Sequence, residues 1–97
     1  MIVIRDIFQL KFGMAKEAKT LLKEGEAINT RAGYGPGRAM VDLVGPYYTL
    51  VLETPAKSLA EYEEALHKIM GMKEWSDWYA KFTNVVESGR REIFTVL

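Results

Sequence analysis

Residues 2–12, IVIRDIFQLKF, alternate between two kinds of side chain along their length. Every second position on one side is apolar except Asp6, while the other side mixes apolar and polar residues. A period of two predicts a β-strand whose two faces meet different surroundings. Residues 90–97, RREIFTVL, form a second alternating segment. We therefore expect a sheet that takes in both ends of the sequence and has one strongly apolar face.

The residues that follow the first strand change to the helical period. Gly13 breaks the strand pattern, and residues 14–28 place apolar side chains every three or four positions with lysines and glutamates between them. This spacing predicts an amphipathic helix packed against the sheet. Residues 29–37 contain three glycines and a proline, which are typical of a loop.

The middle of the sequence predicts a β-hairpin. Residues 38–44 and 47–54 read as two short strands, and Gly45 and Pro46 between them supply the turn. Pro55 is expected to end the second strand, because a proline cannot donate to the hydrogen-bond ladder.

A second helical region follows the hairpin. Ser58 and Glu61 have the spacing of a capping box, so a helix is expected to begin at Ser58. Its apolar stripe breaks at Gly71 and resumes from Trp75 through Val85 and Val86. Ser88 and Gly89 are expected to end this region, since glycine is favoured just after a helix.

The element order is therefore β-α-β-β-α-β, which predicts an α+β, ferredoxin-like sandwich. Its four-stranded antiparallel sheet has the first and third strands at the centre and the helices on one face. The other face would carry an apolar patch interspersed with charges of both signs, which suits a two-fold contact between copies. The apolar positions are Val3, Ile7, Met40, Val44, Tyr47 and Val51, and the charged ones are Arg5, Arg38, Asp42 and Glu53. We expect a homodimer through this open face.

Composition limits the class of protein. Ninety-seven residues, 48% of them hydrophobic, fit one domain spanning residues 1–97. Lysine plus arginine equals aspartate plus glutamate at 13 each, so the charge gives no reason to expect nucleic acid or a membrane surface. The absence of cysteine excludes disulfides and thiolate chemistry. No segment reads as a signal peptide or membrane span, so the expected location is cytoplasmic.

The C-terminal third carries a family resemblance. Residues 75–79, WSDWY, followed by residues 85–93, VVESGRREI, together with the element order, resemble the dimeric α+β barrel superfamily and, within it, the NIPSNAP-like proteins. The resemblance implies a homodimer whose two sheets close into a barrel with the helices outside. Relatives with this fold include cofactor-free monooxygenases, isomerases, haem proteins and members with no assigned activity, so the resemblance implies no single reaction.

Two residues are candidates for acid–base chemistry. Asp6 is the only polar residue on the apolar side of the first strand, where a carboxylate is either desolvated or held by a donor. The alternative is a residue at the sheet margin that is bonded to a loop or a helix terminus. His67 is the only histidine, so no metal site is expected. It is a candidate general base or haem ligand, or else the surface partner of Glu63.

Aromatic residues are the candidates for ligand binding. Trp75, Trp78 and Tyr79 share one helical stripe and could line a pocket for a planar molecule, although such stripes are also ordinary core. Tyr48 points to the helix-covered face in the predicted register. The sequence favours a protein that binds a small organic ligand between sheet and helices without a cofactor. The alternative is a small cofactor-free monooxygenase or isomerase, and whether the protein is an enzyme stays open.

Overall fold

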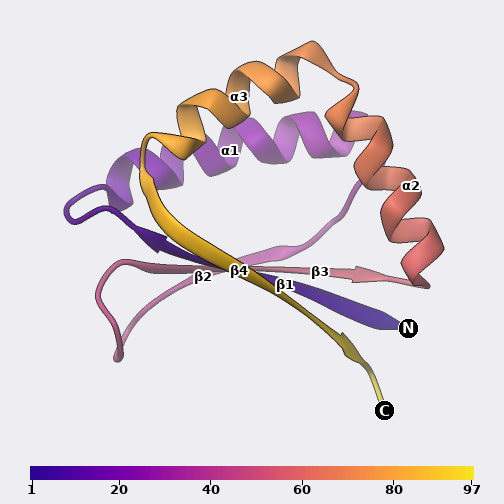
Figure 1. Cartoon of the computed structure of the whole chain (residues 1–97), viewed down its shortest axis with the longest axis horizontal. Coiled ribbons are helices and arrows are strands. Elements are labelled where there is room, and N and C mark those ends of the chain that lie inside the picture. Colours follow the sequence, from indigo (N-terminus) through magenta and orange to yellow (C-terminus); the bar gives the residue numbers. More distant parts are fainter.

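The computed structural model describes residues 1–97 and has the predicted element order, with the second helical region divided in two (Figure 1). The elements are β1 (Ile2–Leu10), α1 (Ala15–Arg31), β2 (Arg38–Val41), β3 (Thr49–Ala56), α2 (Leu59–Met70), α3 (Lys73–Thr83) and β4 (Val86–Thr95). The strands form one antiparallel sheet in the order β2-β3-β1-β4. The expectation of a ferredoxin-like α+β fold with β1 and β3 at the centre is confirmed.

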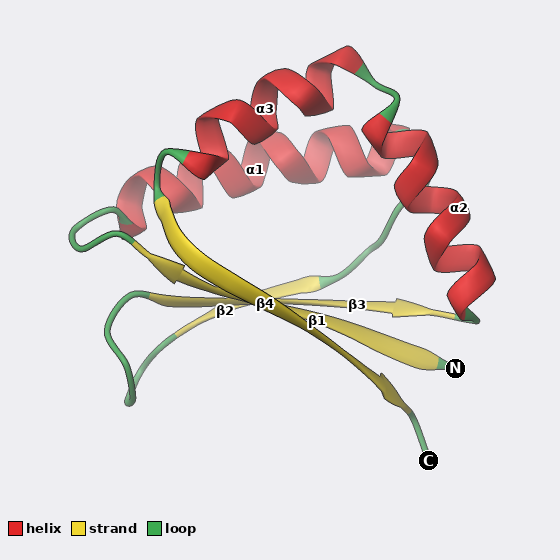
Figure 2. Ribbon diagram, viewed as in Figure 1, coloured by secondary structure: helices red, strands yellow, loops and turns green.

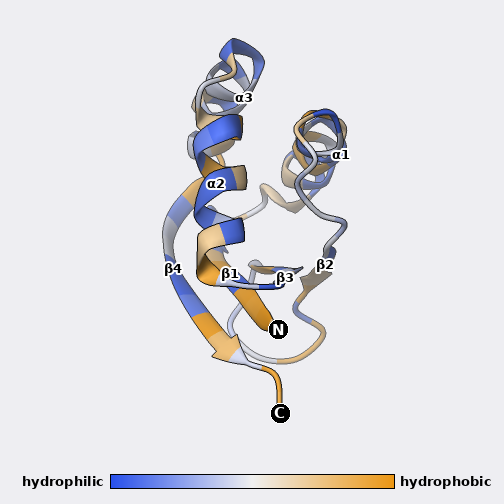
Figure 3. Ribbon diagram, turned by 90° about the vertical axis from the view of Figure 1, so that its right-hand side faces the viewer, coloured by the Kyte–Doolittle hydropathy of each residue, from blue (hydrophilic) through white to orange (hydrophobic).

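All three helices lie over the same face of the sheet, and the other face is uncovered (Figure 2). Seen from the side, α1 lies above the β2–β3 half of the sheet, and α2 and α3 lie toward the β4 edge (Figure 3). The hydrophobic core forms between these layers around Leu10, Ala18, Leu50, Phe82 and Val85. None of the helices is long and apolar enough to cross a membrane.

The helical boundaries follow from local chemistry in two places. The Ser58 hydroxyl accepts a hydrogen bond from the Glu61 backbone N–H at 3.2 Å, so the predicted cap is confirmed. The predicted break is also confirmed, because α2 ends at Met70 with Gly71 as its C-cap.

The hairpin is shorter than predicted, and its connection is longer. β2 ends at Val41 and β3 begins at Thr49. The Asp42 side chain accepts a hydrogen bond from the Thr49 backbone N–H, and Tyr48 has a left-handed φ of 58°, which a β-strand does not accommodate. Leu43, Val44 and Tyr47 therefore lie in an exposed loop rather than on the strand faces, and Leu43 is 97% exposed.

The prediction that Pro55 ends its strand is wrong, since β3 continues to Ala56. β2 begins opposite Glu53, so beyond that point β3 has only β1 beside it, and Pro55 faces Val3. A proline is tolerated there because its missing N–H breaks no bond to a second neighbouring strand.

The predicted end of the last helix is also wrong. α3 stops at Thr83 and β4 begins at Val86, so Ser88 and Gly89 lie inside the strand. Gly89 faces Phe8 across the β1–β4 pair, and a Cβ at position 89 would lie 2.8 Å from Phe8 Cδ1. This glycine is needed for packing and not for a helix C-cap.

Candidate ligand-binding site

A cleft with a volume of about 380 Å³ lies between the C-terminal half of α1, the segment 33–37 and strands β2 and β3. Its size is in the range of pockets that hold small organic molecules. Leu22 and Leu52 provide apolar surface, Trp78 forms a wall, and Tyr34 and Thr54 contribute hydroxyl groups. Charged and polar residues also line it, namely Glu26, Asn29, Thr30, Arg38 and Glu53. The cleft thus combines apolar surface with many polar groups.

The Trp78 wall is held in place by contacts with two helices. Its indole Nε1 donates a hydrogen bond to the Leu21 carbonyl at 2.6 Å, and its ring stacks on Phe82 with centroids 4.9 Å apart. Gly25 on α1 makes this approach possible, because a Cβ there would lie 2.8 Å from Trp78 Cζ2. The glycine in the helix therefore positions the indole.

On the side of the cleft away from Trp78, the loop before β2 packs closely against β3. A Cβ on Gly37 would clash with the Glu53 carbonyl oxygen, so the loop backbone can approach the strand closely only with glycine at this position. Tyr34 comes from the same loop, and its ring centroid lies 6.3 Å from that of Tyr62 on α2.

A polar cluster adjoins the cleft beyond Tyr34. Arg91 Nε on β4 donates to Asp6 Oδ1 on β1 at 2.6 Å, and the Arg91 guanidinium lies 5.8 Å from the centroid of the Tyr62 ring. The Asp6 side chain is only 18% exposed, while Arg91 is half-exposed. Strands, helix and loop therefore bring together Asp6, Tyr34, Tyr62 and Arg91, which we call the tyrosine–arginine cluster.

Burial changes the acid–base behaviour of this cluster. It raises the pKa of Tyr34 from 10.0 to about 12, although the neighbouring Thr54 side chain acts in the opposite direction. Burial also raises the pKa of Tyr62, against the lowering effect of the Arg91 charge. For Arg91, burial lowers the pKa, but the hydrogen bond and the negative charge of Asp6 outweigh it, so the net change is upward. Both phenols stay protonated and Arg91 stays charged near neutral pH.

The Tyr62 hydroxyl is buried and has no hydrogen-bond partner in the protein. The whole residue is only 6% exposed. Buried polar atoms nearly always have a partner, so this hydroxyl is an exception. Tyr62 is not among the residues that line the cleft.

The six residues proposed from the sequence occupy different parts of the molecule. Trp78 lines the cleft, and Asp6 belongs to the tyrosine–arginine cluster. Tyr48 packs on Phe12, with centroids 4.7 Å apart, and on the core around Leu10. Trp75 and Tyr79 stack on each other, with centroids 4.8 Å apart, and do not line the cleft. His67 is exposed on α2 and forms no ion pair with Glu63.

Three members of the cluster were not singled out by sequence reasoning. Tyr34 lies in the expected loop 29–37, and Tyr62 lies in the helical region expected to begin at Ser58. Arg91 lies in the alternating segment 90–97. One pattern in the sequence could have pointed to Arg91. The alternation of β4 puts it on the same face as the apolar Ile93, so a charged residue is expected there among apolar neighbours. No group of histidine, aspartate or glutamate residues is arranged to hold a metal ion.

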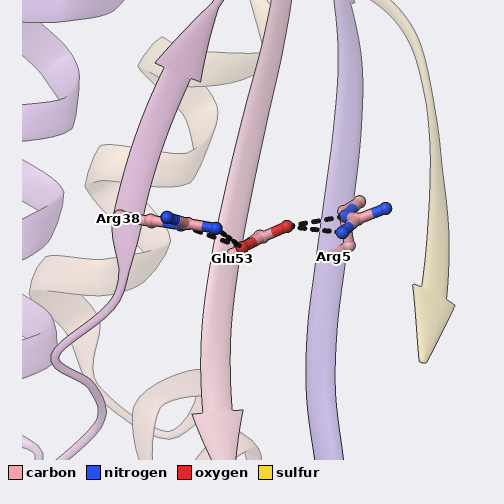
Figure 4. Close-up of polar contacts among 3 residues, drawn as sticks. All are labelled: Arg5, Arg38 and Glu53. Atoms are coloured by element: carbon pink, nitrogen blue, oxygen red, sulfur yellow. Dashed lines mark hydrogen bonds and ion pairs between the residues drawn. The ribbon is translucent and has the colours of Figure 1, made fainter. Parts of the chain in front are cut away.

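The open face of the sheet carries a different ionic arrangement. Glu53 lies between two arginines from neighbouring strands, with Arg5 Nε at 2.8 Å and Arg38 Nε at 2.9 Å from its two carboxylate oxygens (Figure 4). The hydrogen bonds from Arg38 and then from Arg5 hold the pKa of Glu53 below its ordinary value of 4.5. The predicted positions of these three residues on the open face are confirmed.

Comparison with known proteins places the fold. No family model and no curated protein matches the sequence. Among solved structures, a NIPSNAP family protein from Agrobacterium tumefaciens is 23% identical, with 97% of this chain aligned to 90% of that one at a TM-score of 0.90. An uncharacterized NIPSNAP domain protein from Burkholderia xenovorans is 14% identical, with 100% of this chain aligned to 95% of that one at a TM-score of 0.91.

A more distant match is an antibiotic biosynthesis monooxygenase, 11% identical, with 100% of this chain aligned to 99% of that one at a TM-score of 0.77. The class defined is thus the α+β fold that these proteins have in common. Within it, this chain is more similar in shape to the two NIPSNAP structures than to the monooxygenase. The expected NIPSNAP-like fold is confirmed. Another matched structure, also from Agrobacterium tumefaciens, is described as a NIPSNAP family protein with unknown function.

Proposed function

We propose that this protein binds a small, flat organic molecule in the cleft between α1 and the sheet. The observation that carries the proposal is the cleft itself, about 380 Å³ in volume, with the fixed indole of Trp78 as one wall. An aromatic wall favours a planar ligand, because stacking buries a large apolar area at little entropic cost.

The binding test uses the tryptophan in the wall as its reporter. Trp75→Phe leaves Trp78 as the only indole, and a panel of naphthalene and quinoline compounds is titrated while its fluorescence is recorded. Binding in the cleft changes the Trp78 emission in a saturable way. Ala39→Leu places a larger side chain in the cleft and is expected to abolish the change, whereas Ala60→Leu on the exposed surface of α2 is the matched control. A panel without any saturable response contradicts the proposal.

A cofactor-free monooxygenase or isomerase is the second candidate. The observation that favours it is the pair of protonated phenols beside the Asp6–Arg91 ion pair. Hydroxyl groups held in a water-poor site can stabilise negative charge as it develops on a substrate oxygen. Compounds found by the binding screen are tested for turnover. Turnover that is lost in Tyr34→Phe and kept in Tyr79→Phe would support an enzymatic function.

We also propose that the protein forms a homodimer through its open sheet face. Support comes from a row of apolar side chains across three strands, Ile7, Val51 and Met40, which the helices do not cover. The neighbouring charges of Arg5, Glu53 and Arg38 are already paired within the chain, so a partner could pack on this face without leaving a carboxylate unpaired.

Sedimentation equilibrium at micromolar concentration tests the dimer. The chain mass is 11.0 kDa, and a species of that mass alone would refute the proposal. Met40→Glu introduces a charge into the apolar row and is expected to give the monomer, whereas Lys16→Glu on the exposed side of α1 should leave the dimer intact. The proposed location is the cytoplasm, which fractionation of producing cells would test.

A further inference from the structure

One side of α1 contributes a row of residues to the cleft lining. They recur every three or four positions, which is the spacing of neighbours on one side of a helix, and they are Leu22, Gly25, Glu26, Asn29 and Thr30. Gly25 is the point at which the helix meets the tryptophan wall, since a Cβ there would lie 2.8 Å from Trp78 Cζ2. Glu26 is the next residue of the helix, so its place in the lining is close to the Trp78 wall.

Glu26 is the only charged residue of the cleft lining that forms no ion pair. The other two charged residues of the lining, Arg38 and Glu53, are bonded to each other on the open face (Figure 4). Successive side chains of a strand point to opposite faces, so these two side chains belong to the face that the helices do not cover. On the helix-covered side, the cleft therefore has one charge, and it is negative.

The groups around Glu26 leave its carboxylate free. Lys23 precedes it by three residues on α1 and forms no ion pair with it, and the neighbouring Glu24 is paired with Lys81 at 3.1 Å. The Thr30 hydroxyl donates to the backbone carbonyl of Glu26 at 2.9 Å and not to its side chain. A carboxylate only accepts hydrogen bonds, so a ligand that complements it has to donate.

The remaining polar side chains of the lining carry no charge. They are Asn29, Thr30, Tyr34 and Thr54. Burial raises the pKa of Tyr34 to about 12, so this phenol adds no second negative charge near neutral pH. The charge of Glu26 is thus the feature of the cleft that distinguishes most sharply between ligands of the same shape.

We propose, resting on the proposed ligand-binding function, that the ligand is a planar molecule with a positively charged amino group. Its ring lies against Trp78, and its ammonium group pairs with the Glu26 carboxylate. The face of an indole also attracts a nearby cation, so both groups favour the same ligand charge.

Three probes with the same ring system test this assignment by titration calorimetry: 2-naphthylmethylammonium, the neutral 2-naphthylmethanol and the anion 2-naphthoate. The ammonium should bind about fivefold more tightly than the alcohol, which is the upper end for an ion pair at an accessible site. The carboxylate of 2-naphthoate should bind most weakly, because it meets a like charge.

Two substitutions assign the preference to one side chain. Glu26→Gln should remove the advantage of the ammonium and leave the affinity for the alcohol unchanged, so the alcohol also reports whether the variant is folded. Glu26→Lys should make 2-naphthoate the tightest of the three probes. Glu17→Gln is the matched control, because Glu17 is exposed on the first turn of the same helix, forms no ion pair and does not line the cleft.

The outcomes separate this inference from the function on which it rests. Equal affinities for the three probes, or tightest binding of 2-naphthoate to the unmodified protein, would leave a ligand-binding cleft but overturn recognition of a cation. An ammonium preference that survives Glu26→Gln, or that Glu17→Gln reduces equally, would overturn the role of Glu26. Failure of every probe, together with a silent fluorescence panel, would reject both proposals.

Discussion

Arg5 and Asp6 are neighbours in β1 but belong to opposite faces of the sheet, and their surroundings differ accordingly. On the open face, Glu53 joins Arg5 and Arg38, so both carboxylate oxygens have a guanidinium partner. On the helix-covered face, Asp6 has one partner, Arg91, and two buried phenols lie close by. On the open face every oxygen of the carboxylate is paired, whereas on the covered face the Tyr62 hydroxyl has no hydrogen-bond partner in the protein.

This difference separates the two tasks that the sheet can perform. On the open face the Glu53 carboxylate already has two guanidinium partners, so a second surface placed there would leave no carboxylate unpaired. The helix-covered face instead holds the cleft, with the indole of Trp78 as one wall. This contrast is the basis on which we propose the covered face for ligand binding and the open face for the homodimer contact.

The largest effect is expected from comparing one side-chain truncation on the covered face with one on the open face. Leu50→Ala removes a side chain with no exposed surface and should lower the free energy of unfolding by about 2–5 kcal/mol. Met40→Ala, 36% exposed on the open face, should cost less than about 1 kcal/mol in the monomer. Urea denaturation at two protein concentrations measures both. An equal loss at the two sites, independent of concentration, would remove the distinction between the faces.

A smaller effect is expected from the glycine beneath Phe8 on the covered face. Gly89→Ala forces Phe8 to move and should destabilise the protein by about 1–3 kcal/mol. Gly71→Ala is the matched control, since its φ is −79° and its nearest neighbours would be 3.6 Å away. That change should be neutral or slightly stabilising. Thermal unfolding of both variants decides whether close packing requires Gly89.

On the open face, Glu53 should contribute to the loss of folding stability at acid pH. Its pKa is lower in the folded chain than the ordinary 4.5, so the unfolded chain takes up this proton first as the pH falls. The stability that Glu53 gives is therefore complete above pH 4.5 and is lost as the pH falls through the folded pKa. Glu53→Gln should flatten the stability–pH curve in this acid window. A curve parallel to that of the wild type would contradict the pairing.

On the covered face, Tyr34 should make the stability of the protein depend on pH in the alkaline range. The Tyr34 pKa is raised from 10.0 to about 12, so stability from this group is present below pH 10.0 and falls as the pH rises toward 12. An ultraviolet titration should show a late phenol ionisation that is smaller in Tyr34→Phe, where Tyr62 still ionises late. The environment assigned to Tyr34 would be wrong if the two titration curves coincided.

The fold was largely predictable because its main signals are local. The alternation of residues 2–12, the Ser58 cap and the break at Gly71 each act within a few residues of one another. The end of α3 was not predictable in the same way. Gly89 has the sequence context of a helix C-cap, but its role is set by Phe8, which lies far from it in the sequence and meets it only through strand pairing.

The candidate site was only partly accessible from the sequence for the same reason. Trp78 and Asp6 stood out by their residue type and position, and the structure puts them in the cleft and the adjoining cluster. Tyr34, Tyr62 and Arg91 come together only when a loop, a helix and an edge strand converge. Trp75 and Tyr79 share the same stripe as Trp78, but they stack on each other and do not line the cleft.

The hydrogen bond from Trp78 to the Leu21 carbonyl also bears on the cost of binding. An aromatic side chain that a ligand must first immobilise loses rotational freedom at the moment of binding, and the affinity falls by that amount. Here the indole is fixed during folding by Leu21, Gly25 and Phe82. The cleft is in this respect preorganised, because the proposed ligand would meet a flat surface whose orientation is already set and would not lose affinity by fixing it.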